Sequence, residues 1–154
     1  MSEALIELSN ALAAATERAA IHTVAVHTGP RGSSSGVIWR AGIIVTSDHA
    51  LRSDEEIKVT LPEQRVVSAT LVGRDASTDL AVLKCAEAAS PGPAFGDAAA
   101  LAAGHLTLVV GRTRASGPVA ALAAVSLTVA ERRQWGGATL SPYLRLDVGL
   151  QPTA

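Results

Sequence analysis

The sequence has very few aromatic residues and a single cysteine. Phe, Trp and Tyr make up 3% of the 154 residues, whereas hydrophobic residues make up 48%. The core must therefore be built from Ala, Val and Leu. Because Cys85 is the only cysteine, no internal disulfide can form, which is typical of a reducing compartment. Cys85 ends an apolar, strand-like run, where a small buried hydrophobic residue is expected rather than a nucleophile.

The sequence also lacks a strong charge of either sign. The formal net charge is −1 and the pI is about 6.4, and no basic stripe is present, which argues against nucleic-acid binding. Four scattered histidines and one cysteine do not have the spacing of a metal site. Neither a phosphate loop nor a dinucleotide fingerprint occurs. We therefore expect no cofactor.

Long hydrophobic runs are missing as well. The N-terminal stretch has neither a basic region nor an unbroken apolar run, so it does not resemble a secretory signal. The longest apolar stretch, residues 120–130, is short and contains Ser126 and Thr128. These absences predict a cytoplasmic protein that makes no contact with a membrane.

The first half of the chain predicts a helix followed by a closed β-structure. Residues 1–20 are expected to form an N-terminal helix, because Leu5, Leu8 and Leu12 recur on one helical face. Residues 21–86 contain about six short strand patterns separated by turns, with no helix between them. That pattern is typical of an antiparallel barrel or sandwich. The predicted strands are residues 22–28, 36–39, 41–46, 57–61, 66–72 and 80–83.

The second half, residues 87–154, predicts a connector and the first part of a second barrel. A proline-containing stretch of small residues comes first, and strand patterns follow at residues 106–110, 119–129 and 143–148. Three strands leave exposed edges and cannot close into a barrel. We therefore expect a partly molten second half in the isolated chain. The missing strands would come from a C-terminal segment or from a second chain.

One histidine stands where a general base would be useful. The apolar run of residues 42–45 leads directly into Thr46, Ser47, Asp48 and His49. A histidine at the end of a buried strand is held by the scaffold but still reaches solvent, and an unperturbed imidazole titrates near neutrality. The alternative is a polar loop residue with no chemical role.

A carboxylate later in the chain could orient that histidine. A catalytic imidazole needs a partner that fixes its tautomer and stabilises its charged form. Asp79 lies just before a predicted strand, where partial desolvation is expected; otherwise it is a turn or capping residue. Asp48 is expected to be a loop carboxylate, because adjacent side chains on an extended chain point apart.

Two segments resemble the high-temperature-requirement, or DegP-like, branch of the chymotrypsin-fold serine proteases. A TNNHVV-like segment carries the catalytic histidine of that family, and a GxDxxTDLAVLK-like segment carries its aspartate. Here TSDHAL and GRDASTDLAVLK occur in the same order, and weaker similarity continues through residues 94–111, 122–132 and 144–152. The resemblance implies an all-β, trypsin-like double β-barrel with a complete first barrel and an incomplete second one. It also implies that His49 is the general base and Asp79 its orienting carboxylate.

The resemblance also implies a nucleophile that these residues do not contain. The family serine lies in Gly-x-Ser-Gly-Gly, eight positions after the aspartate that Asp147 resembles, and that count passes Ala154. In the vicinity of the oxyanion hole, Thr153 aligns with a family glycine that donates a backbone N–H. Threonine keeps the donor but not the backbone freedom of glycine. Loss of one oxyanion donor typically costs about 10²–10³ in rate.

The sequence thus predicts a serine endopeptidase fragment that ends just before its nucleophile and is inactive alone. The alternative is a catalytically inactive, protease-like binding or scaffolding module. The expected partners are polypeptide substrates and the segment or chain that completes the second barrel. Further copies of the chain are also expected partners, because family members often assemble as trimers.

Overall fold

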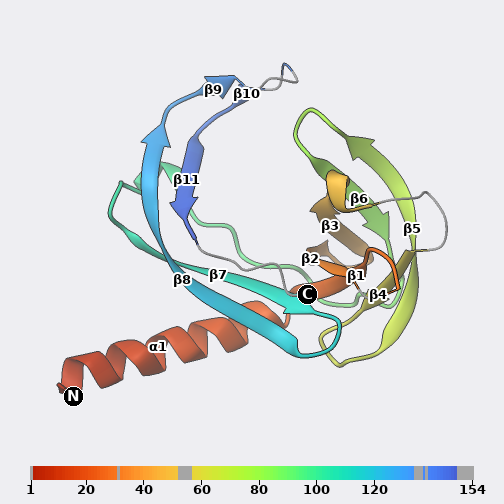
Figure 1. The fold of residues 1–154 in the computed structure, drawn as a ribbon, viewed down its shortest axis with the longest axis horizontal. Coiled ribbons are helices and arrows are strands. Elements are labelled where there is room, and N and C mark those ends of the chain that lie inside the picture. The colour runs from red at the N-terminus through yellow and green to blue at the C-terminus, as the bar shows by residue number, and fades with distance from the viewer. Residues whose placement is uncertain (1, 31, 52–56, 134–136, 138, 149–154) are drawn as a thin grey trace.

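The computed structural model describes residues 2–30, 32–51, 57–133, 137 and 139–148. It consists of an N-terminal helix, a closed barrel of six strands, and a separate three-stranded sheet (Figure 1). None of the described helices is long and apolar enough to span a membrane. The helix and the barrel strands are α1 (Glu3–Ala20), β1 (Thr23–His27), β2 (Ser33–Arg40), β3 (Ile43–Ser47), β4 (Ile57–Thr60), β5 (Val66–Asp75) and β6 (Leu80–Lys84).

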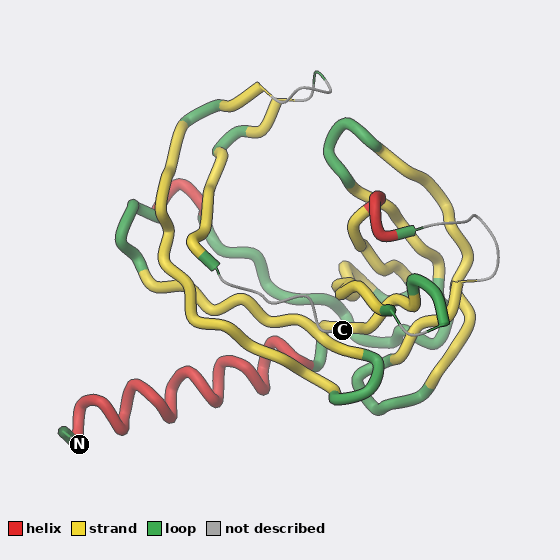
Figure 2. Tube along the Cα trace, in the orientation of Figure 1, coloured by secondary structure: helices red, strands yellow, loops and turns green. Residues whose placement is uncertain are grey.

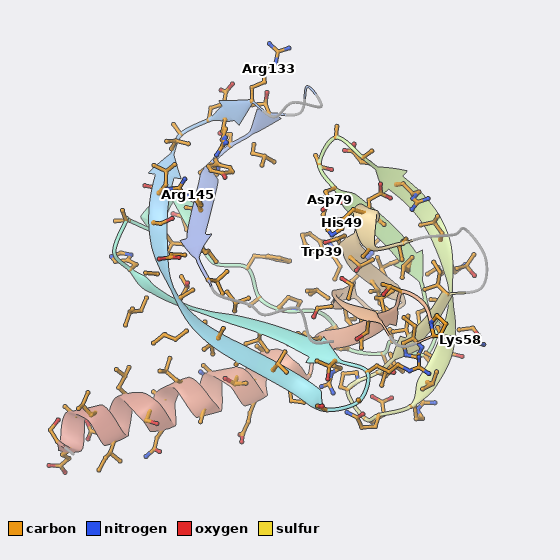
Figure 3. The ribbon with its side chains drawn as sticks, in the orientation of Figure 1. Trp39, His49, Lys58, Asp79, Arg133 and Arg145 are labelled. Atoms are coloured by element: carbon orange, nitrogen blue, oxygen red, sulfur yellow. The ribbon has the colours of Figure 1, made fainter. Side chains whose placement is uncertain are left out.

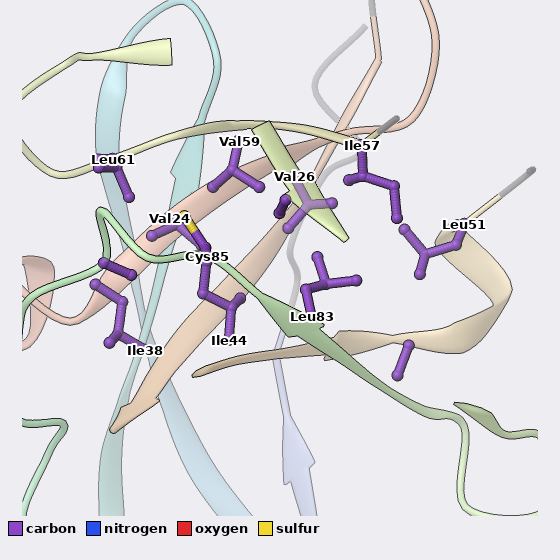
Figure 4. Packing of buried hydrophobic residues seen from close by; sticks show 13 residues of the cluster. Val24, Val26, Ile38, Ile44, Leu51, Ile57, Val59, Leu61, Leu83 and Cys85 are labelled. Carbon is purple, nitrogen blue, oxygen red and sulfur yellow. The ribbon is translucent and has the colours of Figure 1, made fainter. Parts of the chain in front are cut away.

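The barrel closes because every strand pairs with two antiparallel neighbours, in the order β1-β2-β3-β6-β5-β4. Alternate side chains point inward and form the core. Ile44 on β3 lies opposite Leu83 on β6, and both are completely buried. Figure 4 shows these two residues packed with other aliphatic side chains and with Cys85, which is 1% exposed. The prediction of a small buried hydrophobic role for Cys85 is confirmed.

Several predicted strand boundaries were wrong, including the start of β2 and the end of β5. Residues 33–35 were expected in a turn, but β2 begins at Ser33, which pairs with His27 of β1. β5 was expected to end at residue 72, but it continues to Asp75, which pairs with Leu80 of β6. In both places pairing with a neighbouring strand extends a segment whose own sequence favours a turn.

The second half of the chain forms an open sheet, as predicted. The strands β7 (Leu106–Thr113), β8 (Gly117–Val129) and β11 (Tyr143–Asp147) pair in the order β11-β8-β7. The short strands β9 (Arg132–Arg133) and β10 (Thr139–Leu140) pair with each other in a separate two-stranded ribbon (Figure 2). Among the described residues, β7 and β11 each pair on one side only. The incomplete second barrel is therefore confirmed.

A buried arginine joins the helix, the barrel and the open sheet. Arg112 on β7 is only 4% exposed, and burial lowers the pKa of its guanidinium. Its Nε donates to the carbonyl of Thr23 at 2.8 Å, and its Nη2 donates to the carbonyl of Ala20 at 3.0 Å. Its backbone N–H donates to Ser35 Oγ at 3.0 Å. These bonds fix β7 against both the end of α1 and the first barrel.

Replacing Leu83 with alanine should destabilise the barrel strongly. Leu83 is completely buried, so Leu83→Ala removes apolar contacts and leaves a cavity, at a cost of about 2–5 kcal/mol in the free energy of unfolding. Leu80→Ala on the same strand is the matched control, because Leu80 is 47% exposed and should cost about 0.5 kcal/mol. Urea unfolding of both variants measures the difference. Equal losses would contradict the inward placement of Leu83.

Candidate active site

Pairing of β3 with β6 brings the two predicted site residues together. Ser47, the last residue of β3, lies opposite Leu80, the first residue of β6. His49 follows β3 in a short 3-10 helix, η1 (Asp48–Ala50), and Asp79 comes directly before β6. Figure 3 shows both side chains at the same end of the first barrel.

The carboxylate of Asp79 binds both the ring and the backbone of His49. His49 Nδ1 and Asp79 Oδ2 are 2.7 Å apart, and the His49 backbone N–H donates to Asp79 Oδ1 at 2.9 Å. Because an ionised carboxylate only accepts hydrogen bonds, this contact places the proton of a neutral imidazole on Nδ1. Nε2 is then the basic nitrogen, on a side chain that is 76% exposed. The arrangement can accept a proton from an incoming hydroxyl group.

Asp79 has an unusual backbone conformation. Its φ angle is +58°, in the left-handed region that most side chains avoid but aspartate and asparagine tolerate. The preceding turn is held by the carboxylate of Asp75, which accepts from the Ser77 N–H at 2.9 Å and from the Thr78 hydroxyl at 2.8 Å. The Asp79 carbonyl also accepts from the Asp48 N–H at 3.1 Å. A turn held by hydrogen bonds therefore positions Asp79.

Hydrogen bonding rather than burial dominates the ionisation of Asp79. The sequence led us to expect partial desolvation, and the Asp79 side chain is about half exposed, at 47%. The largest effect on its pKa is the hydrogen bond from the backbone N–H of His49, which lowers it. Desolvation raises the pKa by less, and the contacts with the His49 ring lower it further.

Sequence reasoning missed an ion pair on the other side of η1. Asp48, expected to be a loop carboxylate, accepts from Arg74 Nε on β5. Arg74 Nη2 also donates to the carbonyl of Leu51 at 2.9 Å. Arg74 lies within the same family-like segment as Asp79. Asp48 and Arg74 are 26 positions apart in the sequence, and no local spacing rule links residues at that separation.

The remaining predicted site residues, Thr153 and Ala154, lie outside the described residues, so the oxyanion-hole prediction stays a prediction. Two further histidines bond to hydroxyl groups away from the dyad. His22 bonds Ser90, and His27 bonds Thr60, each at 2.8 Å. In the described part of the chain, no group of three His, Cys, Asp or Glu residues could hold a metal ion.

The lowered pKa of Asp79 should survive loss of the His49 ring. Its largest cause is a backbone N–H, which His49→Ala retains. A carboxyl carbon titration by NMR should therefore give Asp79 a pKa below that of an ordinary aspartate in both proteins. The resulting stabilisation is full above the unfolded-state pKa of about 4 and is lost as the pH falls through the folded-state value. An ordinary pKa in His49→Ala would contradict the assignment to the backbone.

Comparison with known proteins identifies relatives with the same architecture. Residues 34–154 match the family model described as a trypsin-like peptidase domain. Serine endoprotease DegS from Escherichia coli is 47% identical over 55 residues, which cover 35% of this chain and 16% of that protein. Serine protease Do-like HtrA from Bacillus subtilis is 36% identical over 85 residues, which cover 52% of this chain and 19% of that protein.

A solved structure matches over most of the chain. The HtrA-type protease AlgW, solved with a tripeptide, superimposes with a TM-score of 0.77 and 30% sequence identity, covering 92% of this chain and 47% of that one. The chain thus spans less than half the length of each of these relatives. The family model covers well over half of the present chain. The chain therefore belongs to the trypsin-like peptidase domain family, and the relatives that it resembles include HtrA-type proteases.

Proposed function

We propose that the full-length protein is a serine endopeptidase in which His49 is the general base and Asp79 its orienting carboxylate. The observation that carries this proposal is the 2.7 Å contact between His49 Nδ1 and Asp79 Oδ2. It leaves the opposite ring nitrogen directed away from the carboxylate, on an exposed side chain. Membership of a peptidase family supports the assignment.

The proposed reaction is acyl transfer from a peptide to a serine. His49 Nε2 takes the hydroxyl proton as the serine Oγ attacks the peptide carbonyl, and it then gives that proton to the leaving amine. In the second half of the reaction, His49 Nε2 takes a proton from water, and the water oxygen attacks the acyl-enzyme. His49 then returns the proton to the serine Oγ as the carboxylic acid leaves. Throughout, the Asp79 carboxylate holds Nδ1–H and stabilises the imidazolium.

The nucleophile is proposed to lie in a part of the full-length protein outside these 154 residues. The sequence contains no Gly-x-Ser-Gly-Gly motif, and it spans 47% of the solved relative. Ser47 is only two positions from His49, and the hydroxyl of Ser141 donates to the Ala130 carbonyl. Neither serine is assigned the role, so the chain alone should not cleave peptides.

Exposed apolar side chains on β2, on β6 and in the connector support packing of a further protein segment. Trp39 and Val37 on β2 are 49% and 36% exposed, and Leu80 at the start of β6 is 47% exposed. Phe95 lies against Trp39 with ring centroids 4.5 Å apart and is 65% exposed. Covering these side chains would remove apolar surface from water. We assign this surface to the C-terminal segment that would complete the second barrel.

The remaining partners follow from the family. The solved AlgW structure contains a tripeptide, which supports polypeptides as the substrates of this protein. Assembly of several copies of the chain is proposed on the family resemblance alone. The cytoplasmic location stays a prediction.

A second candidate function is a protease-like module that binds polypeptides without cleaving them. The sequence feature that favours it is Thr153, which aligns with the glycine of the family oxyanion hole. Such a module would keep the fold and the peptide-binding surface while failing to stabilise the tetrahedral intermediate.

Peptide hydrolysis by the full-length protein tests the proposal. His49→Ala should lower kcat by about 10⁶-fold, because the general base is lost. Asp79→Asn should lower kcat by about 10⁴-fold, because asparagine keeps the left-handed backbone but favours the wrong imidazole tautomer. His105→Ala is the control, since His105 is an exposed histidine that accepts from the Ala102 N–H.

Undiminished cleavage by His49→Ala would contradict the proposal. A wild-type protein that binds the peptide but leaves it intact would instead support the non-cleaving module.

A further inference from the structure

We propose that Arg74 is a positioning residue that holds the short helix η1, and with it the imidazole of His49, in a reactive orientation. This inference rests on the proposed peptidase function. Arg74 does not touch the substrate or the serine in this account. It acts through Asp48 and Leu51, the residues on either side of the His49–Ala50 pair.

Helix η1 has little stability of its own. It is three residues long, and among the described residues its one turn bond runs from the Leu51 N–H to the Asp48 carbonyl at 3.0 Å. Short 3-10 helices have poorer hydrogen-bond geometry than α-helices. Contacts from outside η1 must therefore set the position of His49.

The β5–β6 hairpin provides those contacts from two sides. On one side, Asp79 accepts from the backbone N–H groups of Asp48 and His49, at 3.1 and 2.9 Å. On the other side, Arg74 donates to the Asp48 carboxylate through Nε and to the carbonyls of Asp48 and Leu51 through Nη2, at 3.4 and 2.9 Å. At the C-terminal end of η1, Leu51 is anchored by burial in the barrel core, where it is 7% exposed, and Arg74 adds the hydrogen bond to its carbonyl.

Only arginine can make this set of contacts from one side chain. Its planar guanidinium presents several donors in a fixed geometry, whereas lysine offers a compact point charge. The Asp48 and Arg74 side chains are 17% and 34% exposed, so the pair is partly shielded from water. By contrast, the Arg65–Glu63 pair at the other end of β5 is 58% and 51% exposed, and exposed pairs contribute little.

The arrangement predicts a defect in kcat rather than in substrate binding. A misplacement of about 1 Å at a catalytic group can cost about 100-fold in rate. In the full-length protein, Arg74→Met should therefore lower kcat about 10- to 100-fold with KM unchanged. Arg74→Lys should fall between Arg74→Met and wild type, because its charge can still reach Asp48. Arg65→Met is the matched control and should leave kcat unchanged.

Hydrogen exchange separates positioning from general stability. The His49 amide donates to Asp79 Oδ1, so Arg74→Met should lower its protection while amides within β3 and β6 keep theirs. A merely structural ion pair would change all of these amides together. This readout requires no catalytic activity, so it still tests the inference if the wild-type protein cleaves nothing.

Retained protection of the His49 amide in Arg74→Met would overturn the proposal. So would a loss of protection throughout β3 and β6, which would show general destabilisation. In a protein whose wild type cleaves peptide, an unchanged kcat in Arg74→Met would overturn it as well.

Discussion

The pairing of β3 with β6 is the constraint on which the candidate site depends. Ser47 lies opposite Leu80, and the same register places Ile44 opposite Leu83 in the core. Because side chains alternate along a strand, a slip of one residue would expose Ile44 and Leu83 and bury their polar or half-exposed neighbours. Burial of this pair therefore fixes the register. That register in turn sets His49 beside Asp79, so core packing and site geometry share one cause.

The buried Arg112 fixes the open sheet against the helix and the first barrel. A three-stranded sheet with unpaired edges has few contacts that fix its orientation relative to the barrel. Arg112 on β7 supplies such contacts, because it donates to the carbonyls of Ala20 and Thr23 and to the hydroxyl of Ser35. These bonds satisfy backbone groups at the junction between α1 and β1, where burial without partners would be costly. The second half of the fold is thereby positioned before any further strand packs against it.

Features that depend on local sequence patterns could be predicted from the sequence, whereas features that depend on contacts between distant residues could not. Alternation located the barrel strands, and family-like motifs located His49 and Asp79. The start of β2 at Ser33 was missed because a serine-rich segment becomes a strand only through its partners on β1, on β7 and at Arg114, which follows β7. The Asp48–Arg74 pair was missed for the same reason. The positive φ of Asp79 and its bond to the His49 backbone likewise follow from the folded turn rather than from residue spacing.

Covalent labelling of the full-length protein with a fluorophosphonate tests the central claim most directly. The reagent bonds to a serine Oγ that a neighbouring base has activated, with loss of fluoride, and peptide mapping identifies the labelled residue. The account predicts one labelled serine outside these 154 residues, and no label when His49 is replaced by alanine. A label on a serine within this chain, or labelling that persists in His49→Ala, would contradict it.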